Sequence, residues 1–276
     1  MKKSILFSLL FGAILLSCSN DGPKPTKQVT FNVDAFHVST QPMSGPRHAP
    51  ILDDNDGQAL TDLYIFDGTT QLVHQTSDME SFGTATLVLE YGAHNLSFIA
   101  TRSLGQSYAT GVLSVTSLRP TFGKLQSITV SDATDAFDIA LNRVTGQMII
   151  TIEDAIPADA DHITFQIAQK YDNLLVASLN GTGGYDFEQT ASLTSFVGTE
   201  GKMFTLNMLA PTYQNQYTTD VTISVYRSDD SLLAQHVIDD VPICSNTKTL
   251  LSGELFGGQA FTITANHEWE DSLNAW

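Results

Sequence analysis

The stretch Thr84-Ala85-Thr86-Leu87-Val88-Leu89-Glu90-Tyr91 decides the fold class. Successive side chains of an extended chain point to opposite sides, so Leu87 and Leu89 fall on one face, and Thr86, Val88 and Glu90 fall on the other. A segment of this kind buries one face and leaves the other in water. The stretch therefore predicts a β-strand with one solvent-exposed face.

Short runs with the same two-residue alternation recur along the chain, separated by clusters of Gly, Asp, Asn and Pro. No long 3.6-residue amphipathic pattern follows Pro25, and Pro120 limits the one possible helical turn, at residues 116–123. We therefore expect an all-β chain. The expected strands are residues 29–38, 63–66, 71–75, 84–91, 95–101, 125–130, 136–141, 147–152, 162–169, 174–179, 203–207, 220–226, 232–239, 247–256 and 260–265. Because one sandwich holds about seven strands, this number predicts two tandem β-sandwich domains joined near residues 142–146.

The composition excludes several classes of function. Apolar residues make up 42% of the 276 residues, enough for a packed core, so the chain is not a disordered tail. Asp and Glu number 30 against 13 Lys and Arg, which gives a formal net charge of -17. A surface of this sign repels polyanions, so we expect no nucleic-acid binding.

The N-terminus predicts export. Residues 1–17 have the layout of a secretory signal peptide, with Lys2 and Lys3 ahead of an apolar run that is too short to span a bilayer. The signal ends in Leu15-Leu16-Ser17-Cys18, which resembles a bacterial lipobox, where the cysteine thiol receives a diacylglycerol with palmitate-type chains. We expect Cys18 to be the lipid anchor and residues 18–28 to be a spacer. An ordinary signal followed by an ordinary cysteine is the alternative.

No motif predicts a catalytic, cofactor or metal site. Residues 53–57 (Asp-Asp-Asn-Asp-Gly) resemble a calcium loop, but Leu52 and Asp62 do not suit the first and last ligand positions, and an exposed loop is the simpler interpretation. The seven histidines lack metal-ligand spacing, and no Gly-x-Ser-x-Gly element is present. Residues 181–184 (Gly-Thr-Gly-Gly) are expected to form a hairpin connection. Cys244 is expected to be a small buried hydrophobe.

The last ten residues contain both tryptophans, Trp269 and Trp276, with acidic residues beside Trp269. Two interpretations stay open. The tail docks on the body through Trp269, or it provides a contact surface for a partner, since tryptophan is favoured at interface hot spots.

Four stretches together resemble the fimbrillin superfamily of Bacteroidetes, and in particular its FimB-like anchor or minor subunits. They are the lipobox at residues 15–18, Leu-Thr-Asp-Leu-Tyr-Ile-Phe-Asp-Gly at 60–68, Leu-Asn-Arg-Val-Thr-Gly-Gln-Met-Ile-Ile at 141–150 with Ile156-Pro157 beyond it, and Val-Pro-Ile-Cys-Ser-Asn-Thr-Lys-Thr-Leu-Leu-Ser-Gly at 241–253. The resemblance rests on the order and spacing of the four stretches together.

The resemblance implies two tandem transthyretin-like Greek-key β-sandwich domains, which we place at residues 29–143 and 144–276. It also implies a lipoprotein exposed at the outer membrane that joins other fimbrial subunits by β-strand donation. A donated strand forms hydrogen bonds with the unpaired backbone groups of an open sheet edge. The family uses C-terminal strands for donation, so the expected partner contacts are Phe261, Ile263, Trp269 and Trp276.

Arg47 matches the position at which an arginine-specific protease cuts polymerising members, in the loop after the first strand. If Arg47 is cut, residues 18–47 leave and the body joins a shaft or tip; if it is not, the protein stays at the membrane as the base of the fimbrium. We favour the anchor. A surface glycan-binding lipoprotein is the further alternative, and it needs exposed aromatic side chains such as a cluster of Tyr213, Tyr217 and Tyr226.

Overall fold

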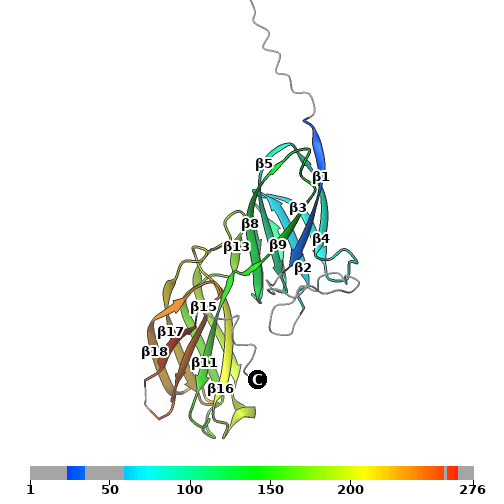
Figure 1. The fold of residues 1–276 in the computed structure, drawn as a ribbon. Coiled ribbons are helices and arrows are strands. Elements are labelled where there is room, and N and C mark those ends of the chain that lie inside the picture. Colours follow the sequence, from blue (N-terminus) through cyan, green and yellow to red (C-terminus); the bar gives the residue numbers. More distant parts are fainter. Residues whose placement is uncertain (1–23, 35–58, 258–259, 267–276) are drawn as a thin grey trace, which may run out of the picture.

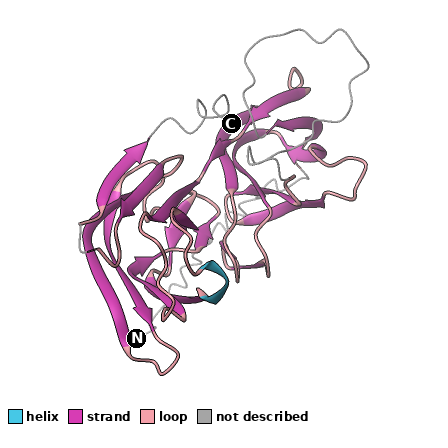
Figure 2. Ribbon diagram, turned by 90° about the horizontal axis from the view of Figure 1, so that it is seen from below, coloured by secondary structure: helices cyan, strands magenta, loops and turns pink. Residues whose placement is uncertain are grey.

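A computed structural model describes residues 24–34, 59–257 and 260–266. In these ranges the chain consists of strands and loops, with one turn of 3-10 helix, η1 (Thr194–Phe196) (Figure 2). The described residues contain no helix that is both long and apolar enough to cross a membrane.

Two sheets form the first sandwich, in the blue to green part of Figure 1. One sheet has the order β4-β1-β9 and the other the order β10-β8-β5-β2-β3. The strands are β1 (Thr26–Asp34), β2 (Asp62–Asp67), β3 (Thr70–Thr76), β4 (Thr84–Glu90), β5 (Gly92–Thr101), β8 (Thr121–Val130), β9 (Ala136–Ala140) and β10 (Asn142–Arg143).

Aromatic side chains fill the first core, between these two sheets. The ring of Phe31 stacks on Phe137 with centroids 5.7 Å apart and is tilted against Phe98 at 5.4 Å. On β4, Leu89 is buried in this core while Val88 is 69% exposed. The alternation predicted for this strand is therefore confirmed.

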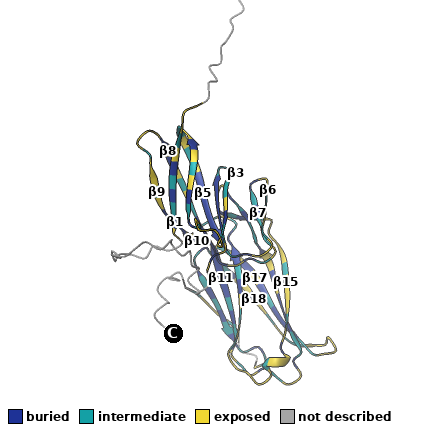
Figure 3. Cartoon of the chain, turned by 90° about the vertical axis from the view of Figure 1, so that its right-hand side faces the viewer, coloured by how far each residue is buried: buried dark blue, intermediate teal, exposed yellow. Residues whose placement is uncertain are grey.

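The second sandwich is also built from two sheets, with the orders β16-β11-β19-β20 and β15-β12-β17-β18. Its core includes Met148, Ile150, Ile163 and Ile223. In Figure 3, β11 consists of buried and partly buried residues, whereas β15 has no buried residue. The strands are β11 (Thr145–Ile152), β12 (His162–Lys170), β15 (Tyr185–Ser192), β16 (Lys202–Leu209), β17 (Tyr217–Tyr226), β18 (Leu232–Ile243), β19 (Lys248–Gly253) and β20 (Thr262–Asn266).

The two sandwiches repeat one topology. In the first, β1 lies between β4, which is antiparallel to it, and β9, which is parallel. In the second, β11 lies in the same way between antiparallel β16 and parallel β19. The facing sheets, β3-β2-β5-β8 and β15-β12-β17-β18, also correspond strand for strand. The expected all-β fold with two tandem sandwiches is therefore confirmed.

A small fifth sheet joins the sandwiches. The first sandwich contributes the hairpin β6 (Ser107–Ala109) and β7 (Val112–Ser114), inserted between β5 and β8, and the second contributes β13 (Asn173–Leu175) and β14 (Asn180–Thr182), inserted between β12 and β15. The order β14-β13-β7-β6 pairs Leu174 of one insertion with Leu113 of the other. Backbone hydrogen bonds therefore run from one sandwich to the other.

A third core lies beneath this small sheet. It contains Phe66, Ile99 and Leu113 from the chain before β10, and Leu174 and Leu209 from the chain after it. This core explains the uninterrupted apolar run of β2, because strands that are buried on both faces lose the apolar–polar alternation. Leu63 and Ile65 face the first core, whereas Tyr64 and Phe66 face the third.

Close packing at this junction requires a glycine in β8. A Cβ atom at Gly123 would lie 3.0 Å from the side chains of Leu179 and Val144. Such contacts are tighter than normal packing, so a larger residue would force the Leu179 and Val144 side chains to shift.

The strand predictions differ from the structure in several places. β1 begins at Thr26 rather than at residue 29 and so includes the end of the expected spacer, and β8 begins at Thr121, where a turn was expected. The strands β6, β7, β10, β14 and β15 were not predicted. The hairpin expected at residues 181–184 is wrong, because this segment connects β14 to β15, which lie in different sheets.

Leu174→Ala tests how far the third core couples the sandwiches. Leu174 is 2% exposed, and a buried Leu→Ala change costs about 2–5 kcal/mol. Because the lost contacts are shared by both sandwiches, we expect one unfolding transition to separate into two in differential scanning calorimetry. Leu125→Ala, at a side chain that is 41% exposed, is the control and should leave a single transition. A single, merely shifted transition for Leu174→Ala would contradict the coupling.

Candidate functional site

Strand addition requires a sheet edge with unpaired backbone groups, and the corresponding last strands of the two sandwiches differ in this respect. β19 pairs along its outer edge with β20, from Lys248 opposite Asn266 to Ser252 opposite Thr262. Its counterpart β9 pairs only with β1 among the described strands. Among the described strands, the first sandwich thus has an open edge at the position where the second has an added strand.

β20 is held by few side chains. Thr262, Ile263 and Thr264 are exposed, Ile263 by 38%. Phe261, just before the strand, packs against the second core and meets His236 edge-on, with ring centroids 5.4 Å apart. Of the two described contact residues predicted from the sequence, Phe261 therefore anchors the strand on this chain, and Ile263 is available at the surface.

The strand β1 is held very differently. It is the central strand of its sheet, and Val29, Phe31 and Val33 are fully buried. Its polar side also has partners, since Asn32 Nδ2 donates to Asp138 at 2.8 Å and the Thr30 and Thr86 hydroxyls are 3.2 Å apart. Removal of β1 would leave an apolar groove bordered by the unpaired edges of β4 and β9.

Four of the predicted site residues lie outside the described residues: Cys18, Arg47, Trp269 and Trp276. The acidic segment at residues 53–57 also lies outside them. The lipid anchor, the processing site and the role of the tryptophans therefore stay predictions.

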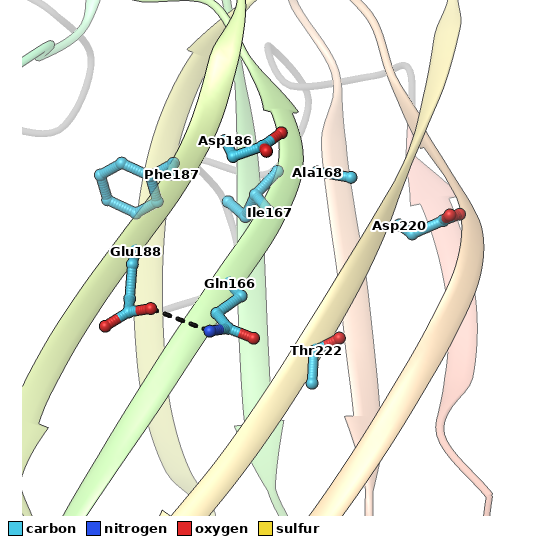
Figure 4. A pocket seen from close by; sticks show the side chains of 8 residues that line it. All are labelled: Gln166, Ile167, Ala168, Asp186, Phe187, Glu188, Asp220 and Thr222. Carbon is cyan, nitrogen blue, oxygen red and sulfur yellow. Dashed lines mark hydrogen bonds between the residues drawn. The ribbon is translucent and has the colours of Figure 1, made fainter.

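A hollow lies on the outer face of the second sandwich (Figure 4). Its volume is about 370 Å³, and three carboxylates, those of Asp186, Glu188 and Asp220, lie around it. Gln166 Nε2 donates to Glu188 at 2.8 Å. No group of three or more His, Cys, Asp or Glu side chains in the described ranges is arranged to hold a metal ion.

The described histidines are paired with carboxylates or stacked on rings. His74 lies 2.8 Å from Asp62 and stacks on Tyr64, and His162 lies 3.0 Å from Asp161. Cys244 is only half-buried, with its Sγ atom 3.6 Å from the carbonyl oxygen of Gln214, so the prediction that it is a buried hydrophobe is wrong.

His94 is the histidine with a shifted pKa. Burial lowers the pKa of His94, but hydrogen bonds from its ring to Asp67 at 2.6 Å and to the Glu90 carbonyl at 2.8 Å outweigh this effect and raise the pKa above its usual value. These contacts link β5 to the end of β2.

The three tyrosines expected to form an aromatic surface do not come together. Tyr217 meets Tyr171 edge-on at 5.5 Å, and Tyr226, at the other end of β17, stacks on His162 at 5.1 Å. Tyr213 packs against the third core. The predicted cluster is therefore wrong.

Comparison with known proteins gives a family and a fold. A family model described as "Family of unknown function (DUF6562)" matches residues 77–275. No curated protein matches the sequence. A candidate adhesin from Bacteroides ovatus has a similar structure, with 8% identity, a TM-score of 0.51, and coverage of 86% of this chain and 88% of that one.

Two fimbrial proteins of Porphyromonas gingivalis are also among the similar structures. The fimbrial anchor protein Mfa2 gives 10% identity and a TM-score of 0.43, covering 88% of this chain and 98% of that one. The tip fimbrial protein Mfa3 gives 10% identity and a TM-score of 0.44, covering 87% and 99%. At the level of the fold, the B. ovatus match agrees with the resemblance found in the sequence.

Phe261→Ala tests whether this ring is the anchor of β20. Loss of its packing against the second core should destabilise the docked strand by about 1.4 kcal/mol, which corresponds to roughly tenfold faster local opening. We expect faster hydrogen exchange at residues 262–266 and unchanged protection in β11. Ile263→Thr, at an exposed position, is the matched control. Equal protection of β20 in Phe261→Ala and the original chain would refute the assignment.

His94→Gln tests the pH dependence of the first sandwich. Because the folded-state pKa of His94 is raised, its contribution to stability is full below the unfolded pKa of about 6.5 and is lost as the pH rises through the folded pKa. The free energy of unfolding should therefore fall more between about pH 5.5 and pH 8 for the original chain than for the variant. Parallel urea titrations measure this, and identical pH profiles would count against it.

Proposed function

We propose that this chain, which belongs to the family of unknown function DUF6562, is a structural subunit of a cell-surface fimbrium, held at the outer membrane by a lipid on Cys18. The observation that carries the proposal is β20, a C-terminal strand added to a sheet edge with most of its side chains exposed. The fold shared with a candidate adhesin supports a role at the cell surface. Such a role is structural and requires no catalytic residue.

Subunits of this kind join by β-strand donation. A strand that adds to an open edge satisfies backbone groups on both chains, and side chains that enter a groove give specificity. This chain has elements for both sides of the exchange, because β20 is weakly held and β9 has an open outer edge in the described part of the chain. The partners proposed are therefore other fimbrial subunits.

The base of the fimbrium is the position that we favour. In an anchor, the lipid on Cys18 stays connected to the body through β1, whose three fully buried side chains each contribute about 1.5–3 kcal/mol. A central strand with this much buried surface resists removal, as a link to the membrane must. Residues 24 and 25, directly before β1, belong to the spacer that the sequence predicts after Cys18.

The alternative is a shaft or tip subunit that is processed after Arg47. Such a cut breaks the chain between β1 and the rest of the protein. Departure of β1 then exposes the apolar groove between β4 and β9. That groove is stable in water only if a strand from a neighbouring subunit replaces Val29, Phe31 and Val33. Processing would thus convert the first sandwich into a strand acceptor.

Intact mass spectrometry distinguishes the two roles. For an anchor, we expect a species that begins at acylated Cys18, confined to the membrane fraction. Cys18→Ala should release the protein from that fraction. Arg47→Lys, which keeps the charge and blocks an arginine-specific protease, should change nothing. A species that begins at His48 in sheared fimbriae would refute the anchor and support the processed subunit.

Two C-terminal deletions test partner contact. Deletion of residues 258–276 removes β20 and Phe261, whereas deletion of residues 267–276 removes only the segment with Trp269 and Trp276. Both chains should stay folded by circular dichroism, because β20 lies at an edge. We expect the longer deletion to reduce fimbrial yield. Loss of yield in the shorter deletion as well assigns partner contact to the tryptophan segment, and unchanged yield in both would overturn strand donation by the C-terminus.

A further inference from the structure

A second pocket lies where the two sandwiches meet. Its walls are the facing edge strands β15 and β16 of the second sandwich, and residues 116–119 of the connection between β7 and β8 close one side. Its volume is about 310 Å³, at the lower end of the range for small-molecule sites. Pockets that bind small molecules occur preferentially at such domain boundaries.

A buried polar cluster forms one wall of this pocket. Lys170, at the end of β12, is only 5% exposed, and its Nζ atom donates to a carboxylate oxygen of Asp172. The hydroxyl of Tyr185 donates to the other oxygen of Asp172 at 2.5 Å. The ammonium group also lies 4.3 Å from the centre of the Phe187 ring. Contacts with Lys170, Tyr185 and the Phe187 ring therefore hold the cluster in place.

Burial of this cluster is costly for the fold. Desolvation lowers the pKa of Lys170, against the opposing effect of Asp172. A buried ion pair adds little stability compared with apolar residues of the same size, because both charges lose their water. In the wall of a pocket, such an ion pair can bind a ligand, because the pair offers hydrogen-bond donors and acceptors in fixed positions.

The lining is also polar, and its buried ion pair, Lys170 with Asp172, is neutral overall. Arg119 adds a positive charge from an exposed side chain, whereas the carboxylate of Glu188 accepts from Gln166 at the hollow of Figure 4. An anion would meet the Asp172 carboxylate, and a cation would meet Lys170 and Arg119. An apolar ligand would displace water from the polar lining without replacing its hydrogen bonds, which costs about 1–3 kcal/mol for each buried group left unsatisfied. These properties favour a neutral ligand rich in hydroxyl groups.

We propose that this pocket binds a neutral saccharide of one or two rings. A sugar hydroxyl both donates and accepts, so it can pair with Asp172 and Lys170 at once, and the amide of Asn207 offers a further polar group in the lining. The ring of Tyr185, which is 42% exposed, supplies an apolar face for the carbon-bound hydrogens of the sugar. The saccharide would bind in an enclosed pocket. This differs from binding on an exposed aromatic surface, which Tyr213, Tyr217 and Tyr226 do not form.

Saturation-transfer difference NMR on the protein without its signal peptide tests the proposal. The neutral probes are methyl α-D-glucopyranoside, methyl α-D-mannopyranoside, methyl β-D-galactopyranoside, N-acetyl-D-glucosamine and lactose, and the charged probes are N-acetylneuraminate and inorganic phosphate. We expect a signal from at least one neutral probe at millimolar concentration and none from phosphate. Binding of the charged probes alone, or of none of the probes, would overturn the proposal.

Two variants place the signal in this pocket. Tyr185→Ala removes the exposed ring, and the double variant Lys170→Met/Asp172→Asn removes both charges together, so that neither is left buried and alone. Each should reduce the signal at least tenfold. The control is Asp186→Asn, since the next residue along a strand faces the other side, and Asp186 lines the hollow of Figure 4 but not this pocket. A signal that survives Tyr185→Ala in a folded chain refutes the site, whereas fimbrial yield with this variant reports separately on assembly.

Discussion

The outer face of the sheet β10-β8-β5-β2-β3 must be covered, and the rest of the molecule depends on how this is done. Tyr64, Phe66 and Ile99 project from this face and would form a large apolar patch in water. The hairpin β6-β7 and the insertion β13-β14 cover it, one from each sandwich. The same burial thus completes the first sandwich and fixes the second against it. Gly123 lies where β8 meets the insertion of the second sandwich, and a Cβ atom there would lie 3.0 Å from the Leu179 side chain, which would have to shift.

Repetition of one topology gives the molecule two equivalent edges that are used differently. The parallel pairs β1-β9 and β11-β19 place a last strand at the same position of each sandwich. The second sandwich carries β20 there, whereas β9 is open along its outer edge among the described residues. An open edge tends to associate with other strands. In a surface subunit, this tendency serves assembly if a partner supplies the missing strand. The junction core then transmits mechanical force between the two sandwiches.

Local alternation in the sequence predicted most of the strands, because each strand of a sandwich buries one face. The expected strand at residues 84–91 is an example, with Leu89 buried and Val88 exposed. The same reasoning missed β15, since Tyr185–Ser192 is polar on an outer edge, and it missed β6, β7 and β14, which have three residues each. Phe261 and Ile263 were found because they lie in or beside a predicted strand. The saccharide pocket was not predicted, because its walls come from residues 116–119, 170–189 and 205–207, and only the fold brings them together. Lys170 gives no local signal either, because the alternation of Ile163, Phe165 and Ile167 places it on the outer face. The irregular register between Ile167 and Lys170 turns it inward.

The junction also determines what kind of ligand site the molecule can hold. A pocket between two loosely linked domains changes shape as they move, and its ligand must then order them at a cost in affinity. Here the pocket is bordered by β15 and the connection after β7, which begin just beyond strands of the small shared sheet, and by β16. The end of β16 lies beside that sheet, where Gly181 N of β14 donates to the Ala210 carbonyl. Asp172 lies directly before β13, so the carboxylate that organises Lys170 and Tyr185 is held by the same strand that couples the sandwiches. Loosening the junction should therefore weaken ligand binding before it unfolds either sandwich, because the polar cluster depends on the position of β13 and the two main cores do not.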